Sequence, residues 1–152
     1  MFVGLLTAPF RNWSFKRLVE WASKNGFKGI EVAVSPSSRQ INIDDVLKGK
    51  ASEVRRILRD VDVEITSLAF YSLKILDDSE DQKFLKKIIE AASLLDVKVV
   101  CTLAGGPKRG KDKKQTIMEE FSEIFGPITD KAEAQGLKTV SYTHLRAHET
   151  SL

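Results

Sequence analysis

The sequence predicts an α/β fold with a parallel sheet, from two observations. Apolar segments of strand length begin near residues 2, 29, 63 and 97, so a strand recurs after 27, 34 and 34 residues. A segment with apolar residues at helical spacing follows each of them. Continuously apolar strands are typical of parallel sheets that are covered on both faces. Alternation of strand and helix implies crossover connections between parallel strands.

The first strand and helix have clear ends. The segment 2–8 is short and apolar, which predicts a buried strand. The segment 14–26 has one apolar stripe and predicts a helix. Ser14 is a good N-terminal cap, because its hydroxyl can accept a hydrogen bond from a free backbone N–H. The Asn25-Gly26 pair is typical of a helix C-terminus.

The later elements repeat this alternation. Ser79 and Gln82 predict a capping box at the start of one helix. The Gly126-Pro127 pair predicts a bend or break in another, because proline lacks the N–H that a helix needs. The expected elements are a strand at 29–34, a helix at 51–61, a strand at 63–70, a helix at 79–96, a strand at 97–104, a helix at 111–136 and the start of a fifth strand at 137–138.

Two architectures use this repeated unit. An eight-unit barrel takes about 250 residues, or roughly 31 per unit. An open doubly wound sheet can be completed in the 152 residues of this chain, but it favours a glycine-rich turn after the first strand. That turn reads TAPFRNWS and has no glycine. The length therefore favours the open sheet, whereas the unit period and the first loop favour the barrel.

The composition is that of an ordinary globular protein, with 42% hydrophobic and 30% charged residues. A net charge of +3 gives no argument for nucleic acid as a partner. Neither a signal peptide nor a membrane-spanning run is recognisable, so we expect no membrane partner. The single cysteine, Cys101, cannot form an internal disulfide, which favours a reducing, cytoplasmic location.

Several segments in this order resemble the sugar phosphate isomerase/epimerase family, which has the xylose isomerase-like TIM barrel fold. The segments that carry the resemblance are VGLLTAPFRNWSFKRLVEWASKNGFKGIEV, VEITSLAFYS, FLKKIIEAASLLDVKVVCTLAGG and EAQGLK. The resemblance runs from about residue 2 to 138. It implies that residues 1–138 are the N-terminal half of a (β/α)8 TIM barrel, with about four βα units and the start of a fifth strand. The loop FYSLKIL departs from the family pattern after the third strand.

The resemblance also implies an activity. Family members are metal-dependent isomerases or epimerases of sugars, sugar phosphates or polyols, and they move a proton next to a carbonyl. A divalent metal (Mn, Mg, Co or Zn) is expected in the full-length protein, and homo-oligomers are compatible with the family. The catalytic carboxylates and metal ligands would lie beyond residue 138, so we expect neither in this fragment. The alternatives are an apurinic-site endonuclease-like metal hydrolase, a catalytically empty half-barrel and an open-sheet binding module.

The resemblance stops where an unusual tail begins. The segment VSYTHLRAHET, residues 140–150, is the translation of a transposase-based sequencing adapter in one frame. We therefore expect 139–152 to be a foreign tail. His144 and His148 are four residues apart and could share a helix face, as zinc ligands do. Their place in this tail argues against a metal site.

Candidate site residues lie at the ends of the expected strands, where barrel enzymes place their chemistry. Glu31 sits within an apolar strand and points into the barrel if its neighbours face the helices. Such a carboxylate contacts substrate or the metal shell, or it pairs with a basic side chain for structural reasons. Four further positions follow strands and could contact substrate, with loop packing as the alternative: Thr7, Phe10, Tyr71 and Gly105.

A basic loop and the cysteine complete the candidates. KRGKDKK, residues 108–114, has five basic residues out of seven and could bind a sugar phosphate or a DNA backbone. A solvated loop and first helical turn is the alternative interpretation. Cys101 falls in the middle of an expected strand, which predicts core packing.

Overall fold

The computed structural model describes residues 3–141. Within this range the strands form one sheet in the order β1-β2-β3-β4-β5, and each strand pairs in parallel with the next along the chain. The strands are β1 (Gly4–Leu6), β2 (Gly29–Ala33), β3 (Glu64–Phe70), β4 (Val99–Thr102) and β5 (Lys138–Ser141).

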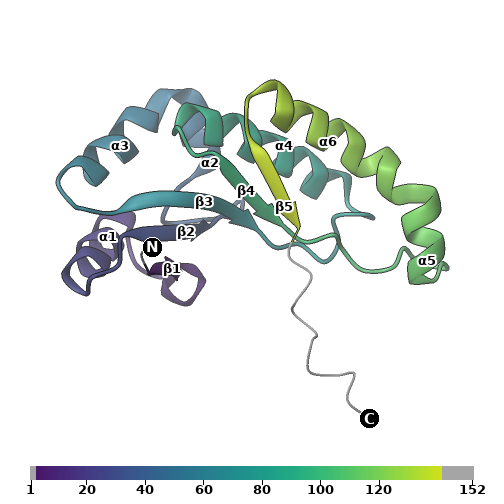
Figure 1. The fold of residues 1–152 in the computed structure, drawn as a ribbon, viewed down its shortest axis with the longest axis horizontal. Helices are drawn as coiled ribbons and strands as arrows, with labels where there is room; N and C mark the ends of the chain where they lie inside the picture. Colours follow the sequence, from purple (N-terminus) through teal and green to yellow (C-terminus); the bar gives the residue numbers. More distant parts are fainter. Residues whose placement is uncertain (1–2, 142–152) are drawn as a thin grey trace, which may run out of the picture.

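The strand order decides between the two architectures. A doubly wound sheet reverses its strand order at one point, whereas a barrel adds each strand beside the last. Here the order is sequential throughout. The sheet is curved, and α3, α4 and α6 lie along its outer side (Figure 1). The α/β class and the half-barrel are therefore confirmed.

The helices begin where the sequence supplies caps. Ser14 Oγ accepts a hydrogen bond from Arg17 N, and Asp112 forms a capping box with Gln115. The helical elements are η1 (Ala8–Phe10), α1 (Phe15–Lys24), α2 (Ile43–Asp45), η2 (Val46–Lys50), α3 (Ala51–Arg59), α4 (Ser79–Leu94), α5 (Lys113–Thr116), η3 (Ile117–Phe121) and α6 (Ser122–Ala134). None of the helices in residues 3–141 is long and apolar enough to cross a membrane.

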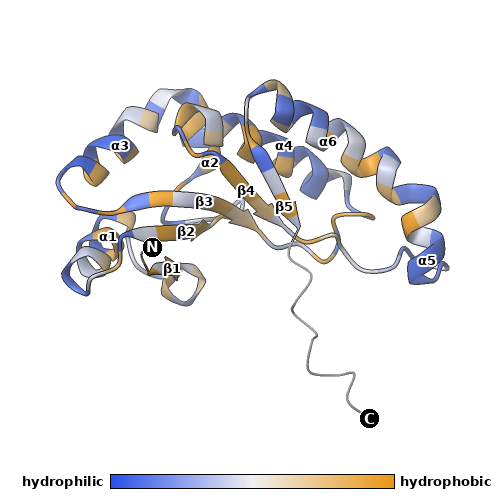
Figure 2. Cartoon of the chain, viewed as in Figure 1, coloured by the Kyte–Doolittle hydropathy of each residue, from blue (hydrophilic) through white to orange (hydrophobic). Residues whose placement is uncertain are grey.

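The core lies between the outer side of the sheet and the helices. Leu85, Ile88 and Ile89 form one fully buried stripe on α4. They face a layer that includes Val32 and Leu68, which are also fully buried. Blue, hydrophilic positions lie along the outer surface of α3 and α6, and orange positions stand out on β2 and β4 (Figure 2). Burial of these side chains holds the helices on the sheet.

The two ends of the sheet are open edges. Val3, just before β1, is 67% exposed, Leu6 on β1 is 41% exposed, and Val140 on β5 is 43% exposed. Edge strands present unpaired backbone groups and pair readily with other chains. The half-barrel therefore has two surfaces on which self-association can begin.

Two sequence predictions need correction, and one unassigned segment is now placed. Asp78, and not Ser79, caps α4, because its side chain accepts bonds from Glu80 N and Asp81 N. The helix at 111–136 does not break at Gly126-Pro127, since α6 continues through it. Its irregularity is the π turn η3, which lies earlier. The segment 35–50, which was not assigned to any element from the sequence, contains α2 and the π turn η2.

The fifth strand is longer than its predicted start. Thr139 to Ser141 pair with Val100 to Thr102, so the strand continues beyond Lys138. Thr139 to Ser141, which the sequence analysis placed in the expected foreign tail, thus belong to a strand of the sheet. A domain boundary at 138 and a foreign origin of 139–152 stay predictions. His144 and His148 lie outside the described residues.

Candidate functional site

Polar side chains meet on the inner side of the sheet near the carboxyl ends of the strands. Glu31 on β2 is in register with Ser67 on β3. Their neighbours Val32 and Leu68 are fully buried under the helices. Because successive side chains of a strand alternate between faces, Glu31 and Ser67 point toward the barrel interior. This arrangement confirms the inward orientation expected for Glu31.

Hydroxyl groups hold the Glu31 carboxylate. Its Oε2 accepts a hydrogen bond from Ser67 Oγ at 2.7 Å, and its Oε1 accepts one from the Tyr71 hydroxyl. No lysine or arginine within residues 3–141 is in ion-pair contact with Glu31. Two hydroxyl donors therefore take the place of the basic partner that a structural role was expected to need. They fix the orientation of the carboxylate without neutralising it.

Cys101 adjoins this carboxylate from β4. Its side chain is buried, as core packing predicts. Burial, together with the neighbouring Glu31 carboxylate, raises the pKa of the Cys101 thiol to about 11. The thiol is therefore protonated at neutral pH and is a poor nucleophile.

Thr7 ties the end of β1 to the end of β2. Its N–H donates to the Glu31 carbonyl at 3.0 Å, and its Oγ1 accepts from Ala33 N at 2.9 Å. The residue is fully buried. Gln40 reaches the same corner and donates from Nε2 to Phe10 O at 2.9 Å. These bonds set the position of the loop that follows β1.

A hollow of about 590 Å³ opens at the carboxyl ends of β1, β2 and β3. Thr7 and Tyr71, two of the predicted site residues, line it. The hydrogen bond from Tyr71 connects the hollow with Glu31. The structure therefore brings Glu31, Thr7 and Tyr71 together, at the end of the strands where barrel enzymes place their active sites.

Phe10 and Gly105 have other neighbours. The Phe10 ring packs against Trp13 and Trp21, with centroid distances of 5.1 and 5.3 Å. Gly105 has a φ of +83°, and a Cβ at this position would lie 2.9 Å from the Ile75 side chain. Both observations favour the packing interpretation of these residues. A direct contact with substrate stays a prediction for them.

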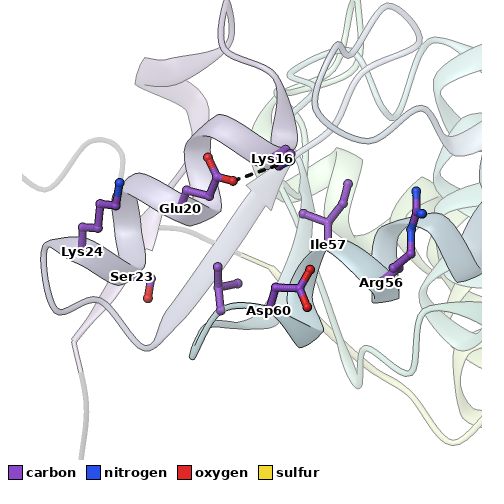
Figure 3. Close-up of a pocket in the computed structure, with 8 residues that line it drawn as sticks. Lys16, Glu20, Ser23, Lys24, Arg56, Ile57 and Asp60 are labelled. Carbon is purple, nitrogen blue, oxygen red and sulfur yellow. Dashed lines mark ion pairs between the residues drawn. The ribbon is translucent and has the colours of Figure 1, made fainter.

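A second hollow, of about 570 Å³, lies on the outside of the molecule. It is a groove between α1 and α3, and we call it the outer groove. Figure 3 shows acidic and basic side chains around it, with an ion pair between Lys16 and Glu20. Arg56 and Asp60 line its other wall. Its charges are mixed, and it lies away from the ends of the strands.

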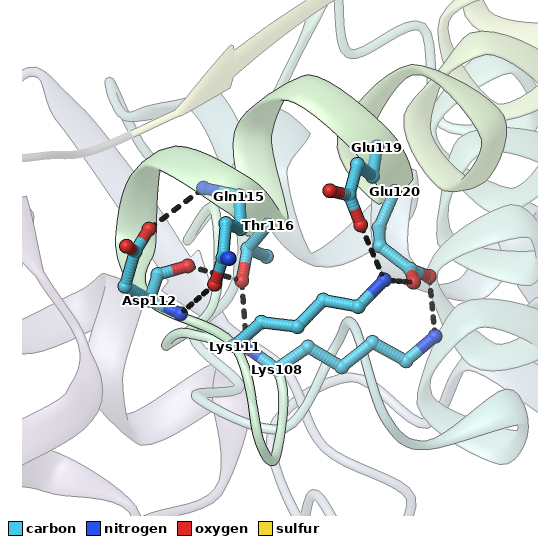
Figure 4. A network of polar contacts seen from close by, with 7 residues as sticks. All are labelled: Lys108, Lys111, Asp112, Gln115, Thr116, Glu119 and Glu120. Carbon is cyan, nitrogen blue, oxygen red and sulfur yellow. Dashed lines mark hydrogen bonds and ion pairs between the residues drawn. The ribbon is translucent and has the colours of Figure 1, made fainter.

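The basic loop has acidic partners. Figure 4 shows the side chains of Lys108 and Lys111 extending to Glu120, and Lys111 also contacts Glu119 at 2.8 Å. These carboxylates raise the pKa of the Lys111 ammonium group. Two of the five basic residues thus belong to a surface ion-pair network, which favours the structural interpretation of this loop.

The described residues do not supply a metal centre. Residues 3–141 contain no group of three or more His, Cys, Asp or Glu side chains that could hold a metal ion. Glu31 and Cys101 are close together, but a third ligand is lacking among the residues described. This part of the chain therefore does not fit a metal on its own.

The sequence interpretation missed several residues of the site. Ser67 is separated from Glu31 by 36 positions, so only the pairing of β2 with β3 brings them together. Arg39 and Gln40 belong to the unassigned loop SPSSRQ, residues 35–40. A serine-rich loop directly after a strand is a signal that could have been used, because such loops carry function in barrels.

The sequence and the fold together define the family. The chain belongs to the xylose isomerase-like TIM barrel family, which matches residues 19–146. A comparison with curated proteins found no match.

Solved structures give the same fold. The probable 3-DHS dehydratase AsbF from Bacillus anthracis aligns with a TM-score of 0.71 at 22% identity, over 95% of this chain and 53% of that chain. The IOLI protein with a bound zinc atom aligns with a TM-score of 0.70 at 19% identity, over 93% of this chain and 51% of that chain. D-psicose 3-epimerase with D-tagatose from Clostridium cellulolyticum H10 aligns with a TM-score of 0.68 at 18% identity, over 91% of this chain and 51% of that chain. The chain thus spans about half the length of these structures.

Proposed function

We propose that the chain is one half of a barrel enzyme that isomerises or epimerises a small sugar or polyol by proton transfer next to a carbonyl. The observation that carries this proposal is the Glu31 carboxylate, held by Ser67 and Tyr71 beside a hollow at the strand ends. Support comes from the family and from solved neighbours that include a D-psicose 3-epimerase crystallised with a sugar. The chain by itself is proposed to be catalytically inactive.

Each residue has a role in this proposal. The Glu31 carboxylate accepts a hydrogen bond from a sugar hydroxyl, and Ser67 and Tyr71 hold it in place for that contact. Thr7 fixes the end of β1 and so shapes the wall of the hollow. The groups that move the proton are proposed to lie in the missing half of the barrel. So are the ligands of a divalent metal, which would polarise the carbonyl when bound.

The test compares two glutamates in the longer protein that contains a complete barrel. Glu31→Gln should lower kcat/KM for its sugar roughly 10- to 100-fold, because a hydrogen bond to a charged group contributes about 1.5–3 kcal/mol. Glu20→Gln in the outer groove removes the same charge and should leave kcat/KM within about twofold. Equal effects of the two variants would contradict the proposal.

The same assays separate the alternatives. A complete barrel that cleaves abasic DNA and leaves ketoses and aldoses unchanged would support the endonuclease-like hydrolase. Turnover by the 152-residue chain alone would contradict the catalytically empty half-barrel.

A further inference from the structure

The hollow at the strand ends carries charge of one sign. Arg11 and Arg39 line it, and none of its lining side chains is acidic. Neither arginine is in an ion pair with another residue of 3–141. A guanidinium group presents a planar set of donors that matches carboxylate and phosphate oxygens. The two arginines are therefore available to an anion that enters the hollow.

Gln40 lines the same hollow, and its side chain carries an unsatisfied buried acceptor. Its Nε2 donates to Phe10 O at 2.9 Å, and Thr7 O lies 3.5 Å away. These two carbonyls fix the orientation of the amide, because only its nitrogen can donate to them. Its Oε1 is buried and has no donor within the described part of the chain. A buried carbonyl without a donor is unfavourable, and a ligand hydroxyl would satisfy it.

The neighbouring loop also suits a hydroxylated ligand. Ser35, Ser37 and Ser38 line the hollow beside Arg39. A serine hydroxyl both donates and accepts, so it can bind either an anion or a sugar hydroxyl. Tyr71 also lines the hollow and connects it with Glu31. A ligand in the hollow would thus extend toward the proposed sugar-binding carboxylate.

We propose that this hollow is a binding subsite for a small hydroxylated oxyanion, with Arg11 and Arg39 on the charged group and Gln40 Oε1 on a neighbouring hydroxyl. The choice of a polyol rests on the proposed function; the anion preference rests on the arginines. A phosphate monoester and a carboxylate share this chemistry. The experiment below therefore has an arm for each.

The first experiment is calorimetric titration of the 152-residue chain with glycerol 3-phosphate, glycerate and glycerol. One of the two anions should bind with a stoichiometry of one, and the tighter of them identifies the oxyanion. Glycerol should bind at least about tenfold more weakly, since it lacks the charge. Arg11→Gln and Arg39→Gln should each weaken binding of the anion about tenfold.

Arg56→Gln is the matched control, because it removes the same charge from the outer groove (Figure 3). It should change binding by less than about twofold if the charge of the hollow, and not the net charge, attracts the anion. Equal weakening by Arg56→Gln would overturn the proposal. So would a folded chain, checked by circular dichroism, that binds neither anion.

A second variant tests the hydroxyl contact. Gln40→Met keeps the length of the side chain and removes the acceptor; because it also removes the donor to Phe10 O, circular dichroism must first show that the variant is folded. It should reduce the preference for glycerol 3-phosphate over inorganic phosphate, while binding of inorganic phosphate stays within about threefold. An unchanged preference would remove Gln40 from the subsite. If Arg11→Gln and Arg39→Gln leave sugar turnover by the longer protein unchanged, the subsite is overturned and the proposed function stays intact.

Discussion

The strand-end hollow and the outer groove have nearly the same volume, about 590 and 570 Å³, but different chemistry. Within residues 3–141, the strand-end hollow has two arginines without an ion-pair partner, a buried amide oxygen without a donor and a link to the Glu31 carboxylate. In the outer groove, basic and acidic side chains face one another and Lys16 pairs with Glu20 at 3.9 Å.

This difference shows why cavity size does not identify a site. The groove between α1 and α3 exists because two helices pack side by side on a curved sheet and leave space between them. Its solvated ion pair contributes little free energy, and its acidic residues, Glu20 and Asp60, partly offset the charge of its basic ones. The strand-end hollow retains polar groups that the fold leaves unsatisfied. Such groups are unfavourable for stability and are typical of binding sites.

The largest expected effect concerns packing beside the strand ends. Gly105→Ala should lower the free energy of unfolding by about 2–4 kcal/mol, because a Cβ would contact Ile75 at 2.9 Å and the φ of +83° disfavours an L side chain. Gly106→Ala is the matched control, since its nearest neighbour is 3.9 Å away. Ser23→Ala in the outer groove should change the free energy of unfolding by less than about 0.5 kcal/mol. Urea unfolding of the three variants measures these changes in the free energy of unfolding, and equal changes in all three would contradict the prediction.

The next effect concerns pH. The pKa of Cys101 is raised from 9.0 to about 11, so only the unfolded state ionises between these values. The contribution to stability is therefore complete below about pH 9 and is lost as pH rises toward 11. It amounts to about 2–3 kcal/mol. Cys101→Ser should remove this part of the pH dependence. Urea unfolding at pH 8 and pH 10.5 tests it, and the same loss in both proteins would show that other groups cause it.

A smaller effect separates the two glutamates. Glu31→Gln should lower the free energy of unfolding by about 1–2 kcal/mol, because Ser67 and Tyr71 lose a charged acceptor but can rotate toward the amide. This is less than the cost of about 3–5 kcal/mol for a broken buried ion pair. Glu20→Gln should cost less than about 0.5 kcal/mol. A cost above 3 kcal/mol for Glu31→Gln would indicate a basic partner.

The smallest expected effect is that of zinc. Residues 3–141 contain no metal-ligand cluster, and the sequence argues against His144 and His148 as ligands. Addition of equimolar zinc should change the melting temperature of the 152-residue chain by less than about 1 °C. A sub-micromolar site that is lost on His144→Ala would contradict this prediction.

The sequence predicted what depends on local pattern. Apolar periodicity and the Ser14 cap located the strands and helices, and an acidic residue inside an apolar strand drew attention to Glu31. Local rules were wrong at Pro127, where the helix continues. The carbonyl that loses its partner belongs to Glu123, which is exposed to water.

Contacts between distant segments could not be predicted in this way. The pairing of Glu31 with Ser67 depends on the register of β2 on β3, which shifts at an irregularity between Ile30 and Glu31. The position of Gln40 depends on bonds to the carbonyls of Thr7 and Phe10. No periodicity marks the segment 35–50, because its π turn and the positive φ of Gly49 interrupt the helical pattern.

The central claim is that the strand-end hollow, and not the outer groove, is the ligand site. The most direct test is ¹⁵N chemical-shift mapping of the 152-residue chain during titration with glycerol 3-phosphate. The largest shifts should fall on Arg11, Arg39, Gln40 and Tyr71. Shifts confined to Lys16, Lys24 and Arg56 would place the ligand in the outer groove and contradict the claim.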